Sequence, residues 1–149
     1  MKSDVNQPVP FSDARAASGS NRNGVIFLSA ERNQTDDPDG LGAGLYASEE
    51  MHNPGARGVD IFVDTTSSGS GTVAVKVQKK DPNSGTWHDI VGAVTATLND
   101  PADSVLTIYP GIAETANVSV SDHLGLTWRV VATVATAAAT FSVGAVYLK

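Results

Sequence analysis

Three histidines are the first candidates for chemical function in this chain, because imidazole can ligate a metal or act as a general base. They are His52, His88 and His123, and none is followed, two to four residues later, by a second ligand. Zinc motifs need such close pairs. The spacing therefore predicts no metal site, and we expect function to be independent of all three.

Two other stretches hold residue types that do chemistry elsewhere. Ser121-Asp122-His123 contains the three residue types of a hydrolase triad, but sequence neighbours cannot form the Ser-to-His-to-Asp arrangement, and no Gly-x-Ser-x-Gly elbow is present. Asp36-Asp37-Pro38-Asp39-Gly40 lacks the alternating ligands and distal Glu of a calcium-binding loop. We interpret them as a turn and a solvated loop. No catalytic, cofactor or metal residues are expected, although a glycosidase-type carboxylate pair stays open, because its criterion is a separation in space.

Trp87 and Trp128 allow two interpretations. Two indole rings exposed on one face would form a platform on which sugars stack. However, Trp128 is in phase with Val130, and Trp87 lies in an expected hairpin strand, so both are typical of residues that anchor a sandwich core. We expect the core for both, with the platform as the alternative.

The elements that must position these residues are short strands. Residues 59–65 place Val59, Ile61 and Val63 on one side and Asp60 and Asp64 on the other, as a half-buried strand does. Residues 72–80 also have a period of two, with Val73, Val75 and Val77 alternating with Ala74, Lys76 and Gln78. Asp81-Pro82-Asn83-Ser84-Gly85 is typical of a hairpin loop. Further strands are expected at 24–30, 86–90, 94–98, 104–109, 127–134 and 140–148. Seven or eight short strands predict an all-β fold, an antiparallel β-sandwich of the jelly-roll or immunoglobulin-like type.

The alanine-rich segment 131–140 is the ambiguous one, since alanine has the highest helix propensity. Its β-branched residues and the alternation of Trp128, Val130, Ala132 and Val134 favour a strand, followed by a turn near 136–139.

Composition limits both the architecture and the partners. The chain has 149 residues, the size of one domain, and contains no cysteine. Its formal net charge of −6 repels a phosphate backbone, so nucleic acid is not an expected partner. No stretch is apolar enough for a signal peptide or a membrane span, and we expect folding in a cytoplasm.

The first 23 residues differ from the rest of the chain. They are rich in Ser, Asn, Asp and Pro and cannot build a core, which predicts an extended N-terminal arm ahead of a single domain at 24–149. The apolar side chains that such an arm could offer to a partner are Val5, Pro8, Val9 and Phe11.

Five short blocks between residues 55 and 146 resemble, in order and spacing, small proteins encoded in the structural gene blocks of tailed bacteriophages. They are Gly55-Ala56-Arg57-Gly58-Val59-Asp60-Ile61-Phe62-Val63-Asp64, the run from Val75 to Trp87, Ile108-Tyr109-Pro110-Gly111, Thr127-Trp128-Arg129-Val130 and Phe141-Ser142-Val143-Gly144-Ala145. Such proteins are similar in size and genomic setting to capsid decoration, or cement, proteins.

The resemblance implies a virion protein without catalytic residues. It would bind the outer surface of the head, hold neighbouring subunits of the major capsid protein together, and associate with itself on the capsid. Arg57, in a loop that enters a strand, could pair with a carboxylate on a capsid subunit, or could instead bond its own loop carbonyls. The alternatives are a glycan-binding module of a head fibre or spike, and an enzyme such as a cell-wall hydrolase.

Overall fold

The computed structural model describes residues 26–29, 43–65, 71–99 and 101–149. These residues form strands and no helix, so the all-β prediction is confirmed, and this part of the chain offers no helix that could cross a membrane. Several predictions fall outside the described residues: the arm at 1–23 with Val5, Pro8, Val9 and Phe11, and the acidic loop at 36–40.

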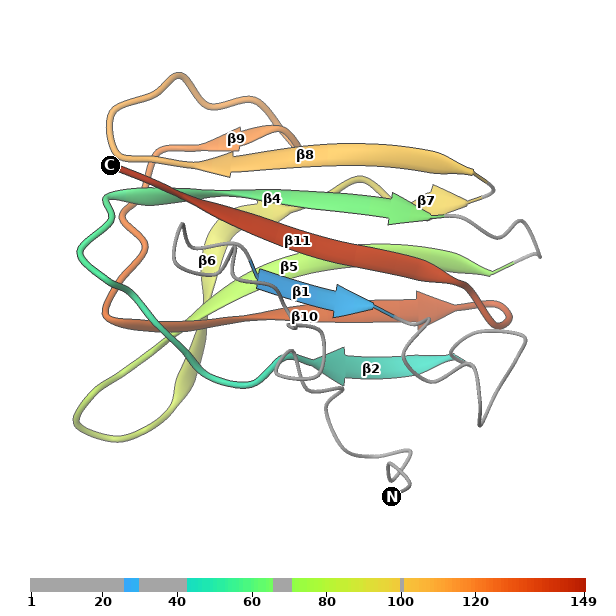
Figure 1. Ribbon diagram of the computed structural model, residues 1–149, viewed down its shortest axis with the longest axis horizontal. Helices are drawn as coiled ribbons and strands as arrows, with labels where there is room; N and C mark the ends of the chain where they lie inside the picture. The colour runs from blue at the N-terminus through green and yellow to red at the C-terminus, as the bar shows by residue number, and fades with distance from the viewer. Residues whose placement is uncertain (1–25, 30–42, 66–70, 100) are drawn as a thin grey trace.

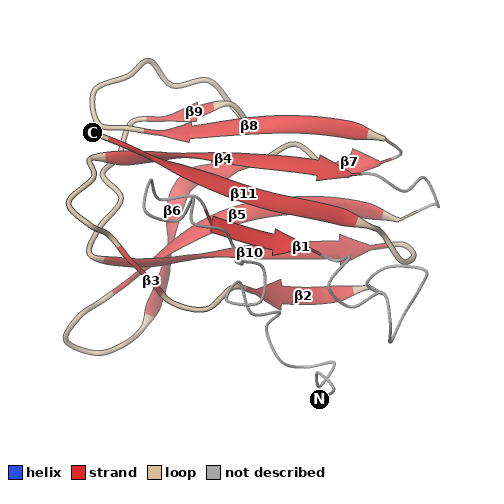
Figure 2. Cartoon of the chain, viewed as in Figure 1, coloured by secondary structure: helices blue, strands red, loops and turns tan. Residues whose placement is uncertain are grey.

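The strands form two sheets packed face to face (Figures 1 and 2). The first sheet, in front in Figure 1, has the order β1 (Ile26–Ser29), β11 (Phe141–Leu148), β4 (Gly58–Thr65), β8 (Ala102–Ile108) and β9 (Ser119–Val120). The second sheet has the order β2 (Gly44–Ala47), β10 (Thr127–Ala135), β5 (Thr72–Lys80) and β6 (Trp87–Val94). Two short strands join the second sheet, β3 (Met51–His52) beside β10 and β7 (Leu98–Asn99) beside β5.

Eight of these strands pair as one long hairpin folded back on itself. β1 pairs with β11, β2 with β10, β4 with β8 and β5 with β6, all antiparallel. The pairs β4–β11 and β5–β10 then join these ladders into two sheets. This connectivity is a jelly roll, so of the two sandwich types expected from the sequence it is the one found.

The core lies between the sheets and follows the predicted alternation. On β4 the inward residues are at most 1% exposed and on β5 they are fully buried: Val59, Ile61, Val63, Val73, Val75 and Val77. Phe141 on β11 and Trp128 on β10 also have no exposed surface. Gly58 marks a close approach of β4 and β8, because a Cβ there would overlap the carbonyl oxygen of Ile108.

Both predicted turns are found. In the β5–β6 loop, Asp81 Oδ1 accepts a hydrogen bond from Asn83 N at 2.8 Å, and Gly85 adopts a φ of 78°. The alanine-rich segment is a strand that ends at Ala135, and the chain turns before β11. Thr136 has a φ of 74° in this turn.

The prediction of a strand at 94–98 is wrong. β6 runs on to Val94 through an irregular pairing with β5, and the chain then leaves the ladder. Thr95, the next residue, makes two hydrogen bonds with Val75 of β5. Its Oγ1 accepts from Val75 N at 3.1 Å, and its own N donates to Val75 O at 2.9 Å. The short strands β2, β3 and β9 were not predicted.

Candidate partner-binding loops at one end of the sandwich

Four loops gather at one end of the sandwich, on the left in Figure 1, where the C-terminus also lies. They join β3 to β4, β5 to β6, β8 to β9, and β9 to β10. We call this region the loop end. It contains Arg57, the site residue that the sequence places in the domain.

Arg57 is exposed and lies in the loop between β3 and β4. Its guanidinium carbon is 5.2 Å from the centre of the Tyr109 ring, a cation–π contact. Within the described part of the chain its guanidinium has no carboxylate partner and bonds none of its own loop carbonyls. The cation is therefore held over an aromatic ring, with its donors directed to the surroundings.

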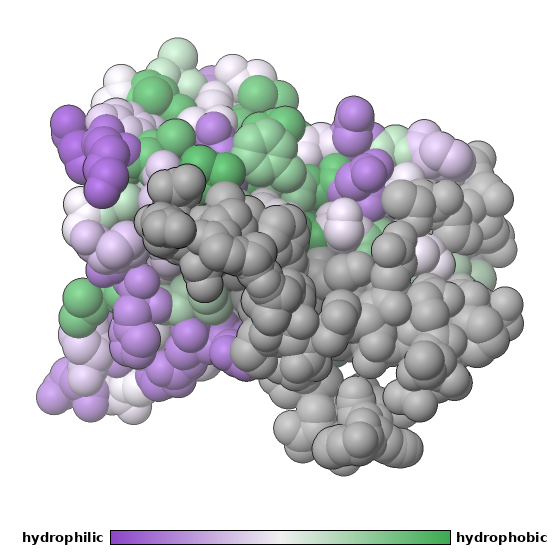
Figure 3. Space-filling view, viewed as in Figure 1, coloured by the Kyte–Doolittle hydropathy of each residue, from purple (hydrophilic) through white to green (hydrophobic). Residues whose placement is uncertain are grey.

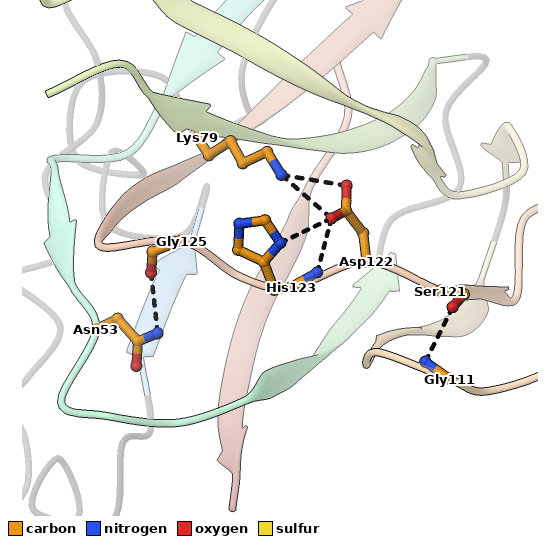
Figure 4. A network of polar contacts seen from close by, with 7 residues as sticks. All are labelled: Asn53, Lys79, Gly111, Ser121, Asp122, His123 and Gly125. Carbon is orange, nitrogen blue, oxygen red and sulfur yellow. Dashed lines mark hydrogen bonds and ion pairs between the residues drawn. The ribbon is translucent and has the colours of Figure 1, made fainter. Parts of the chain in front are cut away.

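Asn53 ties the Arg57 loop to the loop before β10 (Figure 4). Its Oδ1 accepts from Gly55 N at 3.1 Å and from Ala56 N at 2.7 Å. Its Nδ2 donates to Ala56 O and to Gly125 O, both at 2.9 Å. Since an amide side chain offers two donors and two acceptor sites, all of its capacity is used. Its own N also donates to Leu126 O, so the two loops are fastened together.

Asp122 anchors the second loop to β5. Lys79 Nζ lies 3.2 Å from Asp122 Oδ1 and Oδ2, and His123 Nδ1 lies 3.1 Å from Oδ1 (Figure 4). Partial burial raises the pKa of the Asp122 carboxyl, but hydrogen bonds from His123 N and Lys79 outweigh it and leave the pKa below its usual value. Asp122 is thus an ionised anchor.

Ser121 takes no part in this contact. Its Oγ accepts a hydrogen bond from Gly111 N at 2.9 Å, whereas the His123 ring contacts Asp122 (Figure 4). A nucleophilic serine needs a base that accepts its proton, and in the described residues no such bond joins Ser121 to His123. Residues 121–123 lie in the loop before β10.

Leu126 is the most exposed apolar side chain of the loop end, at 67%. Open hollows lie on either side of its loop, with volumes of about 500 Å³ and 320 Å³. Both are lined by His123, Gly125 and Leu126. Gly125 has a φ of 88° and packs on Lys79, where an added Cβ would lie 3.4 Å from the lysine Cβ, which favours glycine here. The backbone therefore presents Leu126 from a fixed position between two depressions.

Of the three histidines, His88 and His123 line the same hollow of about 320 Å³, and His52 does not. His52, His88 and His123 are exposed and lie in β3, in β6 and in the loop before β10. In the part of the chain that the structure describes, no three His, Asp or Glu side chains are close enough to hold a metal ion.

The two tryptophans lie on opposite faces of the second sheet. Trp128 pairs with Lys79, in the inward phase of β5, and is fully buried, as predicted. Its Nε1 has no hydrogen-bond partner among the described residues, and the Tyr147 ring meets it edge-on with ring centres 5.8 Å apart.

The prediction that Trp87 belongs to the core is wrong. Trp87 pairs with Lys80, in the outward phase of β5, and is half-buried. The Arg129 guanidinium carbon lies 4.3 Å and Lys80 Nζ 5.5 Å from the centre of its ring. Because Trp128 faces inward, the two rings do not form a sugar-binding platform.

Some residues of the loop end were missed from the sequence. Asn53-Pro54-Gly55 is a turn signal that could have suggested the role of Asn53. No local signal places Tyr109 under Arg57, because they are distant in sequence. Leu126 is in phase with Trp128 and Val130, which would have suggested the core, but it precedes β10 and points outward.

Comparisons of the chain with protein-family models, with curated proteins and with solved structures find no match.

Proposed function

We propose that this protein is a capsid decoration protein of the tailed-bacteriophage type. It binds the outer surface of the head through the loop end and helps hold neighbouring subunits of the major capsid protein together. The observation that carries the proposal is a fastened loop end that presents Leu126 and the guanidinium of Arg57 outward.

The fastening of the loops favours binding. A loop that must be ordered on contact costs conformational entropy, whereas a loop already held in place does not. The side chains of Asn53 and Asp122 hold the two loops through six atoms outside their own residues: Gly55 N, Ala56 N, Ala56 O, Gly125 O, His123 N and Lys79 Nζ. The loop end therefore meets a partner in its binding conformation.

The chemistry of the loop end fits a protein partner that has a carboxylate beside an apolar depression. Leu126 supplies apolar area, and the two hollows beside it can each receive a side chain of the partner. Arg57 supplies a planar cation whose donors match a carboxylate. Arginine is one of the residue types enriched among those that carry most of the binding energy at protein interfaces.

The fold agrees with this role by analogy. Jelly rolls occur in viral capsid domains and also in lectins. The glycan-binding alternative required Trp87 and Trp128 to be exposed on one face, and Trp128 is fully buried. The resemblance to proteins of phage structural gene blocks supports capsid binding.

Co-sedimentation with heads tests the proposal. Heads of the phage that carries the gene are prepared without this protein, and binding of the wild type is compared with Leu126→Ser and Arg57→Gln. We expect saturable wild-type binding and an affinity about tenfold lower in each variant, the loss typical of an interface anchor.

Leu45→Ser and Lys76→Gln are the matched controls. Leu45 is 68% exposed on β2, almost the same as Leu126, and Lys76 lies on the outer face of the second sheet. Both variants should bind as the wild type does. Wild-type protein that stays in the supernatant at every concentration contradicts the proposed function.

A further inference from the structure

The outer face of the first sheet has a surface chemistry different from that of the loop end. Its outward residues on β4 and β8, which we call the acidic face, are Asp60, Phe62, Asp64, Asp103, Val105 and Thr107. Phe62 is 43% and Val105 45% exposed. Figure 3, which views this side of the molecule, shows apolar side chains gathered over β4 and β8. A monomer does not need to expose such residues side by side.

The strand register arranges these residues in rows. Phe62 lies directly opposite Val105, and the next row sets Asp64 directly opposite Asp103. Like charges that face each other across a strand pair destabilise a sheet. A local arrangement that costs stability is typical of a surface kept for binding.

The described strands around the acidic face supply no counter-charge. Among the described residues, the strands of the first sheet contain no Lys or Arg. The cations in the strands of the second sheet have contacts of their own. Lys76 pairs with Asp89 at 3.2 Å, Lys79 with Asp122 at 3.2 Å, and Lys80 with Glu50 at 2.5 Å. Arg129 lies over the Trp87 ring and donates to Gln78 Oε1. The acidic face therefore fits a partner surface that supplies Lys or Arg side chains.

We propose that the acidic face is a second docking surface, for an apolar protein surface that bears Lys or Arg side chains. Phe62 and Val105 meet the apolar part, and Asp64 and Asp103 pair with the cations. This inference rests on the proposed function, in which the partner is the major capsid protein. A protein that holds two neighbouring subunits together needs two contact surfaces, and the loop end and the acidic face differ in charge and position.

The test removes the two facing carboxylates with minimal change of shape. Asp64→Asn combined with Asp103→Asn should bind heads about tenfold more weakly than the wild type, and its binding should depend less on salt concentration. The same substitutions relieve a repulsion, so thermal melting should be unchanged or higher, which separates loss of binding from loss of folding.

Glu49→Gln combined with Glu50→Gln is the matched control, since it removes the same number of charges from exposed positions between β2 and β3, outside the loop end. It should bind as the wild type does. Phe62→Thr combined with Val105→Thr should weaken binding while the salt dependence persists, because the carboxylates remain.

Three other outcomes would overturn the inference, and each can be told from the others. If the Asp64→Asn, Asp103→Asn variant binds heads as the wild type does while Leu126→Ser has lost affinity, the acidic face is not a contact and the proposed function stands. If the wild type does not bind, the proposed function and this inference fall together. If the purified protein forms an oligomer that this variant dissociates, the occupant is a second copy.

Discussion

Single residues fasten the loop end, and Asn53 is the one on which it depends most. Its side chain makes three hydrogen bonds within the Arg57 loop and a fourth to Gly125 O in the loop before β10. Substitution Asn53→Ala should lower the free energy of unfolding by about 1–3 kcal/mol, because backbone groups that it bonds lose their partners. Urea denaturation measures the change.

Asn83→Ala is the control for this prediction, since Asn83 is exposed in the β5–β6 loop and only its backbone N is bonded, to Asp81. It should change stability by less than about 0.5 kcal/mol. Equal destabilisation by the two substitutions would show that Asn53 does not fasten the loops.

Asp122 links the stability of the loop end to pH. Because the pKa of its carboxyl is lower in the folded protein than the usual 3.8, the ionised form stabilises the fold above that value. The contribution is lost as the pH falls through the folded-state pKa. The urea midpoint should therefore fall less between about pH 6 and about pH 3 in Asp122→Asn than in the wild type. Glu114→Gln should keep the full wild-type decrease, and an Asp122→Asn variant with the same decrease would contradict the assignment.

At the scale of elements, the turn between β10 and β11 stores strain. Thr136 has a φ of 74°, and Ala137 N donates to Ala135 O across it at 2.8 Å, the bond of a tight γ-turn. This backbone region is unfavourable for a β-branched residue and open to glycine. Thr136→Gly should raise the free energy of unfolding by about 1 kcal/mol in thermal or urea denaturation.

Thr133→Gly, within β10, should instead lower the free energy of unfolding. Thr133 is exposed within β10, where glycine lowers strand stability by about 0.5–1 kcal/mol. If both glycine variants are destabilised alike, the turn is not strained at Thr136.

The long strands were predictable because apolar and polar side chains alternate along them, and the apolar side chains are those that face the core. Val59, Ile61 and Val63 show the buried side of β4 directly in the sequence. β2 and β3 were not predictable, since they contain only four and two residues and exist through their pairing with β10. The end of β6 was misplaced because its pairing with β5 is irregular and breaks the period of two around Val91 and Gly92.

The binding surfaces were only partly predictable for the same reason. Arg57 was expected in a loop before a strand, and it is found there. Its contact with Tyr109, the link from Asn53 to Gly125 and the opposition of Asp64 and Asp103 join segments far apart in the chain. Such contacts follow from the jelly-roll connectivity, which no local pattern specifies.

At the scale of the whole molecule, charge is separated between the two sheets. The net charge of −6 describes the chain as a whole, whereas in the described residues the Lys and Arg of the strands belong to the second sheet. A uniformly acidic surface would attract basic partners and repel acidic ones over its whole area. Under the proposed function, Arg57 of the loop end and the carboxylates of the acidic face instead meet groups of opposite charge on the capsid.

The N-terminal arm is a further contact expected from the sequence. Residues 1–20 are too polar to fold alone, and Phe11 is the one aromatic residue among them. Deleting them should leave thermal melting nearly unchanged and reduce the affinity for heads at least about tenfold, or about 1.4 kcal/mol. A truncated protein that binds fully would show the arm to be incidental, and one that fails to fold would place it in the core.

The copy number of the protein in the virion tests the central claim most directly. Quantitative mass spectrometry of purified particles gives its ratio to the major capsid protein. A decoration protein occupies a site that repeats with the capsid lattice, so the account predicts a fixed ratio comparable to the number of capsid subunits or capsomers. A few copies per particle, as for a spike or an enzyme, or none at all, would contradict it.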